Sequence, residues 1–282
     1  MATPAPAESG AHRALWRRFR HNLRILHVLA AMDFKLKYAG SALGYVWSVV
    51  KPLALFTMLY LVFGRIFDLR TISAYYPLSL LIGIVLFTFF AEATSLGMAS
   101  VVERAELIRK LSFPRLVIPT SRTVGVAITF AVNVSVIAAF IAWNEIRPNW
   151  NWLLLAPLFV ELFLFTLGVT LILATLFVRL RDVGQIWELF SQLLFYATPI
   201  IYPIGFLPPW ARNIAFLSPF TQVLQDVRAI VLYQDLPENR ITAADVFEGY
   251  GGRLIPIGIA AVVFVVGVVV FRRAAPSFAE RV

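Results

Sequence analysis

The chain has 282 residues, is 60% hydrophobic and carries a formal net charge of +9. Soluble domains are about 45–50% apolar, so this composition excludes an ordinary soluble domain and indicates a membrane protein. The sequence contains no cysteine, which excludes disulfides, thiolate nucleophiles and cysteine metal sites. The first 30 residues lack an uninterrupted apolar core and a small-residue cleavage site. We therefore expect no cleaved signal peptide and a single membrane domain.

The region before the first long apolar run divides into two parts. Residues 1–11 are rich in Pro and Ala and are expected to form a disordered tail. Over 12–35, arginines recur at helical spacing on one face, and apolar residues occupy a face away from it. This pattern predicts an amphipathic helix that lies in the membrane interface. A surface helix packed on a soluble neighbour is the alternative.

Six apolar segments predict an all-α membrane protein with six transmembrane helices. The segments are about 45–67, 76–100, 116–143, 153–178, 186–202 and 254–271. Between the last two, residues 205–233 are too interrupted by proline for one span and too apolar for an ordinary loop. We predict that they form short helices that re-enter the membrane, with their irregular backbone shielded by protein.

The distribution of basic residues orients these spans. Sixteen of the 25 Lys and Arg residues lie in the N-terminal region, in the 103–115 and 179–182 links and in the C-terminal tail. Cytoplasmic loops are enriched in Lys and Arg, so we expect these parts, both termini included, to be cytoplasmic. The basic charge is then mostly topogenic, and no nucleic-acid partner is indicated.

The link between the second and third spans has the sequence VERAELIRKLSFPRL, from Val102 to Leu116. It carries four cations and a helix-sized block that ends at Pro114. A protein made of apolar spans offers few surfaces to a soluble partner, and this link is the strongest candidate for one. The alternative is a topogenic charge cluster without a partner.

Several chemistries are excluded by missing residues. All three histidines precede the first span, and no lysine follows a glycine, so a GxxxxGK[ST] phosphate loop is absent. No GxSxG sequence or paired-aspartate diphosphate site occurs either, so we assign no catalytic and no metal-binding residue. Three acids lie within predicted spans: Glu92, Glu161 and Glu188. Glu92 is the most central, and it forms either an interhelical hydrogen bond or part of an ion relay.

Four segments, in this order, carry a resemblance to a known family. They are LKYAGSALGYVWSVVKPLA (36–54), AELIRKLSFPRLVIPTS (105–121), RDVGQIWELFSQLLFYATPIIYP (181–203) and LSPFTQVLQDVRAIVL (217–232). From about residue 12 onward the chain resembles the membrane subunit of type-2 ATP-binding-cassette exporters of O-antigen, teichoic acid and galactan chains. Residues 36–282 would form the transmembrane domain. In the last segment the family often has Asn before the proline, where this chain has Ser218.

The resemblance implies a homodimer with a pore between two copies, and two separate ATPase subunits that bind ATP and magnesium. This chain itself would bind no cofactor. The resemblance also implies that 105–113 is a coupling helix seated in the ATPase. Its residues are Ala105, Glu106, Leu107, Ile108, Arg109, Lys110, Leu111, Ser112 and Phe113. The substrate would be a polyprenyl-diphosphate-linked glycan that crosses a bacterial plasma membrane.

A sliding glycan needs many weak aromatic contacts, and its diphosphate needs cations near the cytoplasmic surface. The candidate pore-lining aromatics are Tyr60, Phe63, Trp187, Phe195, Tyr196 and Tyr202. For each of them, contact with lipid or with another helix is the alternative. The candidate diphosphate or headgroup contacts are Arg13, Arg17, Arg20, Arg24, Lys35 and Lys37. Attraction to anionic lipid is their alternative role.

Three other functions remain open at this point. They are a type-2 exporter of drugs or lipids, a membrane scaffold for glycan assembly without transport, and an ion-coupled carrier. The predicted outer loops are short, which argues against exporters with a large extracellular domain.

Overall fold

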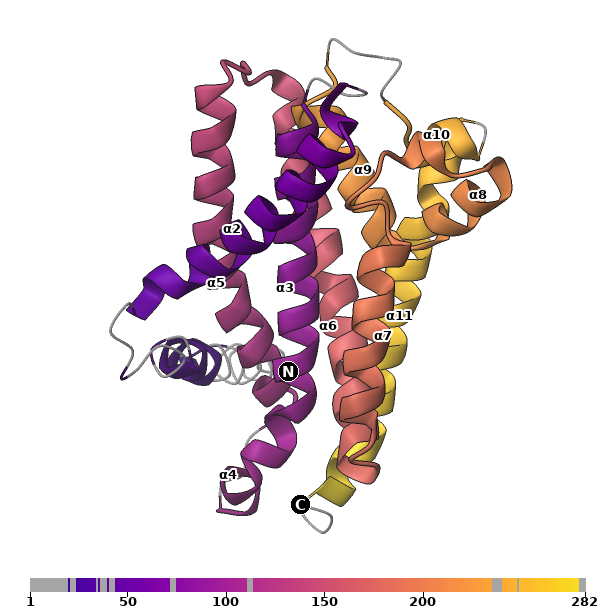
Figure 1. The fold of residues 1–282 in the computed structure, drawn as a ribbon. Coiled ribbons are helices and arrows are strands. Elements are labelled where there is room, and N and C mark those ends of the chain that lie inside the picture. Colours follow the sequence, from indigo (N-terminus) through magenta and orange to yellow (C-terminus); the bar gives the residue numbers. More distant parts are fainter. Residues whose placement is uncertain are drawn as a thin grey trace, which may run out of the picture.

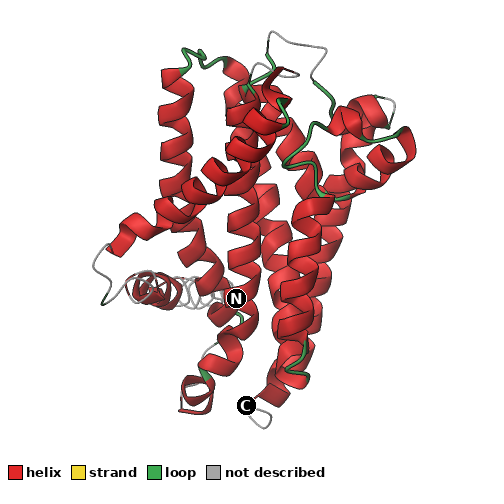
Figure 2. Ribbon diagram, in the orientation of Figure 1, coloured by secondary structure: helices red, strands yellow, loops and turns green. Residues whose placement is uncertain are grey.

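The computed structural model describes residues 20, 24–33, 35, 40, 44–71, 75–110, 114–234, 240–247 and 249–278. Over these residues the chain is helical and contains no strand, which confirms the predicted all-α class (Figure 2). The long helices run between two ends of a bundle (Figure 1). One end carries α4 (Ala105–Lys110), and the other carries α8 (Pro209–Leu217) and α10 (Ala243–Val246).

Five of the six predicted spans are helices long and apolar enough to cross a membrane. Their full extents are Gly44–Ile66, Tyr76–Glu103, Val117–Trp143, Trp150–Arg179 and Gly251–Ser277. Their α-helical parts are α2 (Trp47–Leu59), α3 (Tyr76–Glu103), α5 (Val117–Trp143), α6 (Leu155–Arg179) and α11 (Leu254–Ala274). Short 3₁₀ or π segments extend or join them: Gly44–Val46, Tyr60–Ile66, Leu69–Thr71, Trp150–Leu154, Ile204–Phe206, Tyr250–Arg253 and Ala275–Ser277.

The segment predicted as the fifth span, 186–202, differs from the other five. It forms α7 (Val183–Ala197), which has 15 residues. At about 1.5 Å per residue this helix extends roughly 22 Å, whereas a bilayer core is about 30 Å thick. The helix stops before Pro199, which would clash with the preceding turn and lacks a backbone donor. The count of six spans and the cytoplasmic termini therefore stay predictions.

The segment 205–233 contains two short helices, α8 and α9 (Pro219–Val231). Each begins with a proline, whose fixed φ suits the first turn of a helix. Residues 24–33 are also helical and lie across the bundle toward the α4 end (Figure 1). They belong to the amphipathic helix predicted for 12–35. The predicted 1–11 tail lies outside the described residues.

The centre of the bundle is α3. Most of its residues are buried, which is typical of a helix surrounded by others, and Leu80, Ile84 and Phe90 are at most 1% exposed. It packs against α2, α5, α6, α7 and α9. The other helices are therefore arranged around a mostly apolar and largely buried α3.

The most extensive helix contact joins α6 and α11, and it depends on two glycines. A Cβ added at Gly267 would collide with the Gly168 carbonyl oxygen, and one added at Gly168 would lie 2.7 Å from Phe264 Cα. Small residues allow such close backbone approach between membrane helices, where van der Waals packing stabilises association.

The helix α9 is polar yet almost wholly buried, and Arg228 anchors it. The Arg228 guanidinium donates to the carbonyls of Pro199 (2.7 Å), Ser79 (2.8 Å) and Ile200 (3.0 Å). Tyr76 donates to the neighbouring Ile201 carbonyl at 2.8 Å. These bonds satisfy backbone acceptors where α7 ends, and they join α9 to α3 at that place.

The glycine contact gives a direct stability prediction. Gly267→Ala should lower the free energy of unfolding by about 1–3 kcal/mol, because the new methyl group must displace the α6 backbone. Gly258→Ala on the same helix is the control, since a Cβ there meets nothing within 4 Å and alanine favours a helix. Thermal unfolding of the purified variants measures both. Equal melting temperatures for the two variants would contradict the close α6–α11 contact.

Candidate functional site

The short helix α4 projects from one end of the bundle and divides its residues between two environments (Figure 1). Ile108 is buried in an apolar cluster that also includes Ile118 of α5 and Phe271 of α11, so the base of α4 belongs to the packed core. Glu106, Arg109 and Lys110 are exposed, and Lys110 pairs with Glu106 at 2.5 Å. The helix thus presents charged groups outward from an anchored base. Leu111, Ser112 and Phe113 of the predicted 105–113 helix lie outside the described residues.

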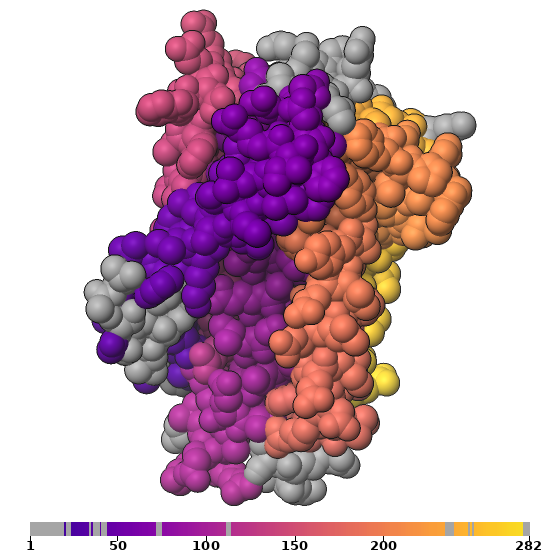
Figure 3. Space-filling view, viewed as in Figure 1, coloured from indigo at the N-terminus to yellow at the C-terminus, as the bar shows by residue number. Residues whose placement is uncertain are grey.

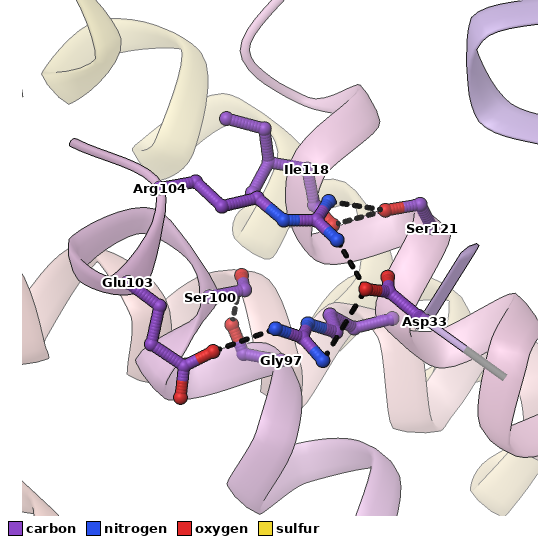
Figure 4. A network of polar contacts seen from close by, with 8 residues as sticks. Asp33, Gly97, Ser100, Glu103, Arg104, Ile118 and Ser121 are labelled. Atoms are coloured by element: carbon purple, nitrogen blue, oxygen red, sulfur yellow. Dashed lines mark hydrogen bonds and ion pairs between the residues drawn. The ribbon is translucent and has the colours of Figure 1, made fainter. Parts of the chain in front are cut away.

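An ion-pair network lies directly beside α4. Asp33, on the 24–33 helix, pairs with Arg104 at the start of the α4 link and with Arg122 of α5 at 3.4 Å. Arg122 also pairs with Glu103 at 2.7 Å, and Arg104 donates to Ser121 Oγ at 3.3 Å. Figure 4 shows the Asp33 carboxylate facing the Arg104 guanidinium, with Ser121 beside it.

Burial makes Asp33 the critical member of this network. Its side chain is 7% exposed, whereas that of Glu103 is 48% exposed. Removing one partner from a buried ion pair costs about 3–5 kcal/mol, because the other charge is left uncompensated. An exposed pair contributes only about 0–1 kcal/mol. Asp33 therefore holds the 24–33 helix against both arms of the α4 link.

A second feature is a cleft of about 780 Å³ whose walls are α2 and α7. Figure 3 shows the hollow between these helices, with α3 recessed behind them. We call it the α2–α7 cleft. It is lined by Trp47, Ser48, Lys51, Pro52, Leu55, Phe87, Thr88, Ala91, Glu92, Thr129, Asn133, Ser191, Gln192, Phe195 and Tyr196.

The lining of the α2–α7 cleft mixes polar and aromatic groups. Lys51, Glu92, Asn133 and Gln192 come from four different helices and face one cavity. Polar groups on membrane helices are costly unless they face protein or water, so this cleft is a wettable surface within an apolar bundle. The two flanking helices, together with the 3₁₀ segment before α2, expose large apolar side chains: Tyr45, Trp47, Leu55, Met58, Ile186, Leu189, Phe190, Leu193 and Tyr196. Such a surface requires cover by lipid or by another protein chain.

The six candidate pore aromatics fall into different environments. Phe195 and Tyr196 line the α2–α7 cleft, and Tyr196 is 65% exposed. Trp187 is buried and donates its indole N–H to Thr94 Oγ1 at 3.1 Å. Tyr60 and Phe63 lie on the π segment after α2 and pack partly against the core, and the Tyr202 hydroxyl donates to the Ala197 carbonyl. The cleft therefore brings two of the six together.

The candidate cations are only partly described. Arg20, Arg24 and Lys35 are exposed, whereas Arg13, Arg17 and Lys37 lie outside the described residues. Two important charges were missed by sequence reasoning, Asp33 and Arg228. The sequence signal for Asp33 is its isolation, because it is the only acidic residue between Glu8 and Asp68. No local sequence pattern indicates the carbonyl partners of Arg228.

Comparison with known proteins places this geometry in a family. The family model described as ABC-2 type transporter matches residues 25–232. An O-antigen export system permease protein RfbA of Klebsiella pneumoniae is 30% identical over 209 residues, which cover 74% of this chain and 80% of that protein. The protein of the same name from Myxococcus xanthus is 27% identical over 219 residues, which cover 76% of this chain and 82% of that protein.

The matched region begins within the 24–33 helix and ends one residue after α9. It includes the Asp33 network, α4 and every helix that lines the α2–α7 cleft. The relatives are named as permeases of a transport system, which is consistent with a non-enzymatic membrane subunit. On this match the chain belongs to the ABC-2 type transporter family.

Proposed function

We propose that the chain is the membrane subunit of an ATP-driven exporter that carries a polyprenyl-diphosphate-linked polysaccharide across a bacterial plasma membrane. Two copies would form the pore, and two ATPase subunits on the cytoplasmic side would bind ATP and magnesium. The observation that carries the proposal is the α2–α7 cleft in a chain similar over three quarters of its length to O-antigen export permeases. Hydroxyl-rich cargo suits a cleft with amide, hydroxyl and aromatic groups.

The geometry of the cleft supports a dimer as the working unit. One wall of the cleft is α2 and the other is α7, and both expose apolar residues next to it. A second copy packed on these exposed faces would cover them and close the open cleft into a channel. Weak contacts along such a channel would let a long chain slide instead of binding tightly.

The arrangement of α4 supports a coupling role. Its exposed charges can orient docking on an ATPase surface, because charged groups set register and suppress wrong partners. Its buried Ile108 and the Asp33 network connect it to α5, α11 and the 24–33 helix. A displacement of α4 by a bound ATPase would therefore be transmitted to several helices of the bundle.

Reversal of two charges on α4 tests the coupling role. Arg109→Glu with Lys110→Glu should reduce co-purified ATPase subunit at least about tenfold, since like charges placed across an interface cost several kcal/mol. The control reverses Arg272 and Arg273, two exposed cations at the same end of the bundle but on α11. Pull-down from detergent extracts measures the bound ATPase. Full recovery of the ATPase with the α4 variant would exclude α4 as the docking element.

Loss of the Asp33 charge tests transmission through the network. Asp33→Asn should lower transport per ATP hydrolysed by about fivefold or more, in the range of typical coupling free energies. Glu103→Gln makes the same acid-to-amide change at an exposed partner and should stay within about twofold of the wild type. Vesicles containing the complete complex allow both rates to be measured. Equal transport-to-ATP ratios in the two variants would show that Asp33 has no special role.

A bulky side chain in the cleft tests the route. Ala91→Trp fills the floor of the α2–α7 cleft and should reduce glycan export at least about tenfold, because pore width limits passage. The matched control is Ala139→Trp on an exposed face of α5 outside the cleft. Export is scored by surface glycan in a strain that depends on this chain. A scaffold without transport activity would tolerate Ala91→Trp as well as the control.

A further inference from the structure

A second pocket lies between α6, α9 and α11, at the end of the bundle opposite α4 (Figure 1). We call it the α6–α11 pocket. Its volume is about 610 Å³, within the range of small-molecule sites, and it shares no residue with the α2–α7 cleft. Neither the proposed transport route through the α2–α7 cleft nor the proposed coupling role of α4 uses the residues that line this pocket.

The deep part of the α6–α11 pocket presents hydrogen-bond acceptors that lack donors. Gln222 is 1% exposed, and its Oε1 atom has no partner among the described residues. The same holds for the buried Oε1 atom of Glu161 on α6. Of the two N–H groups of the Gln222 amide, one donates to Asp226 at 2.8 Å, and the Gln222 side chain also interacts with that of Glu161. Buried polar atoms are normally paired, so these acceptors point to a ligand that donates hydrogen bonds.

The charge of the deep part favours a cationic donor. Glu161 and Asp226 both line the pocket, and Asp226 is 3% exposed. Arg253 lies 3.4 Å from Asp226 and partly offsets its charge. An ammonium group would satisfy Gln222 and Glu161 together, and charge-assisted bonds are about twice as strong as neutral ones.

Two other parts of the pocket have different chemistry. Arg240 is exposed, and Arg253 has an Nε atom without a partner among the residues described, so two guanidinium groups are available for an anion. Guanidinium groups match phosphate geometry well. The walls include Leu154, Val160 and Ile257, apolar side chains that are 39–58% exposed on helices able to span a membrane.

From this arrangement we infer that the α6–α11 pocket binds an aminophospholipid whose headgroup carries a primary ammonium next to a phosphate. The ammonium bonds to Gln222 and Glu161, the phosphate to Arg240 and Arg253, and the acyl chains lie along the apolar walls. Choline is excluded as the preferred headgroup because its methylated nitrogen has no N–H to donate. A purely anionic headgroup would meet the carboxylates of Glu161 and Asp226.

Headgroup preference tests the inference on the unaltered protein. The purified full-length chain is delipidated and titrated with phosphatidylethanolamine, phosphatidylcholine or phosphatidylglycerol of identical acyl chains, and bound lipid is counted by native mass spectrometry. Phosphatidylethanolamine should bind at least about tenfold more tightly than either other lipid, a factor that corresponds to about 1.4 kcal/mol. Equal binding of the three lipids would overturn the inference.

Two variants locate the binding. Glu161→Gln should weaken phosphatidylethanolamine binding about tenfold and remove most of the preference over phosphatidylcholine. Arg240→Gln, at an exposed position that leaves packing intact, should weaken phosphatidylethanolamine and phosphatidylcholine alike, because both carry the phosphate. Glu188→Gln on α7 is the control, since it removes an exposed acid remote from the pocket. Wild-type lipid binding in both Glu161→Gln and Arg240→Gln would overturn the assignment of the site.

Discussion

The arrangement of this bundle depends on a buried arginine that binds backbone carbonyls. Arg228 lies on α9 and donates to Ser79, Pro199 and Ile200, so it joins α3 to the chain segment that follows α7. A helix that ends among apolar neighbours leaves carbonyls without donors, and water is scarce there. Arg228 supplies donors to the Pro199 and Ile200 carbonyls just after α7. The Tyr202 hydroxyl supplies one to the Ala197 carbonyl at the last residue of the helix. Without Arg228, the buried Pro199 and Ile200 carbonyls would lose these donors.

The early end of α7 explains how polar side chains come to lie inside an otherwise apolar bundle. Because the chain turns at Thr198–Tyr202, the following residues form α8 and α9 instead of a longer span. The buried α9 then brings Gln222 and Asp226 to the α6–α11 pocket, while α7 itself forms one wall of the α2–α7 cleft. Both cavities border α3 or α6, whose packing supplies rigidity. The two polar surfaces therefore lie on different parts of one packed bundle.

Much of the fold could be predicted from local pattern. Long apolar runs identified five spans, and a charged block ended by Pro114 identified α4, because both signals come from neighbouring residues. The length of α7 could not be derived in this way, since apolar residues continue past the point where Pro199 and Arg228 end the helix. The site was only partly predictable for the same reason. Phe195 and Tyr196 carry an aromatic signal, but the Asp33 pairs and the α2–α7 cleft arise from contacts between residues far apart in the chain.

The Asp33 network also bears on how movement would pass through the protein. One carboxylate binds Arg104 before α4 and Arg122 after it, so Asp33 links the two ends of the connection from α3 through α4 to α5. Bending at either end of this connection would have to separate Asp33 from Arg104 or from Arg122. A displacement of α4 relative to the bundle would therefore act on the 24–33 helix as well as on α3 and α5.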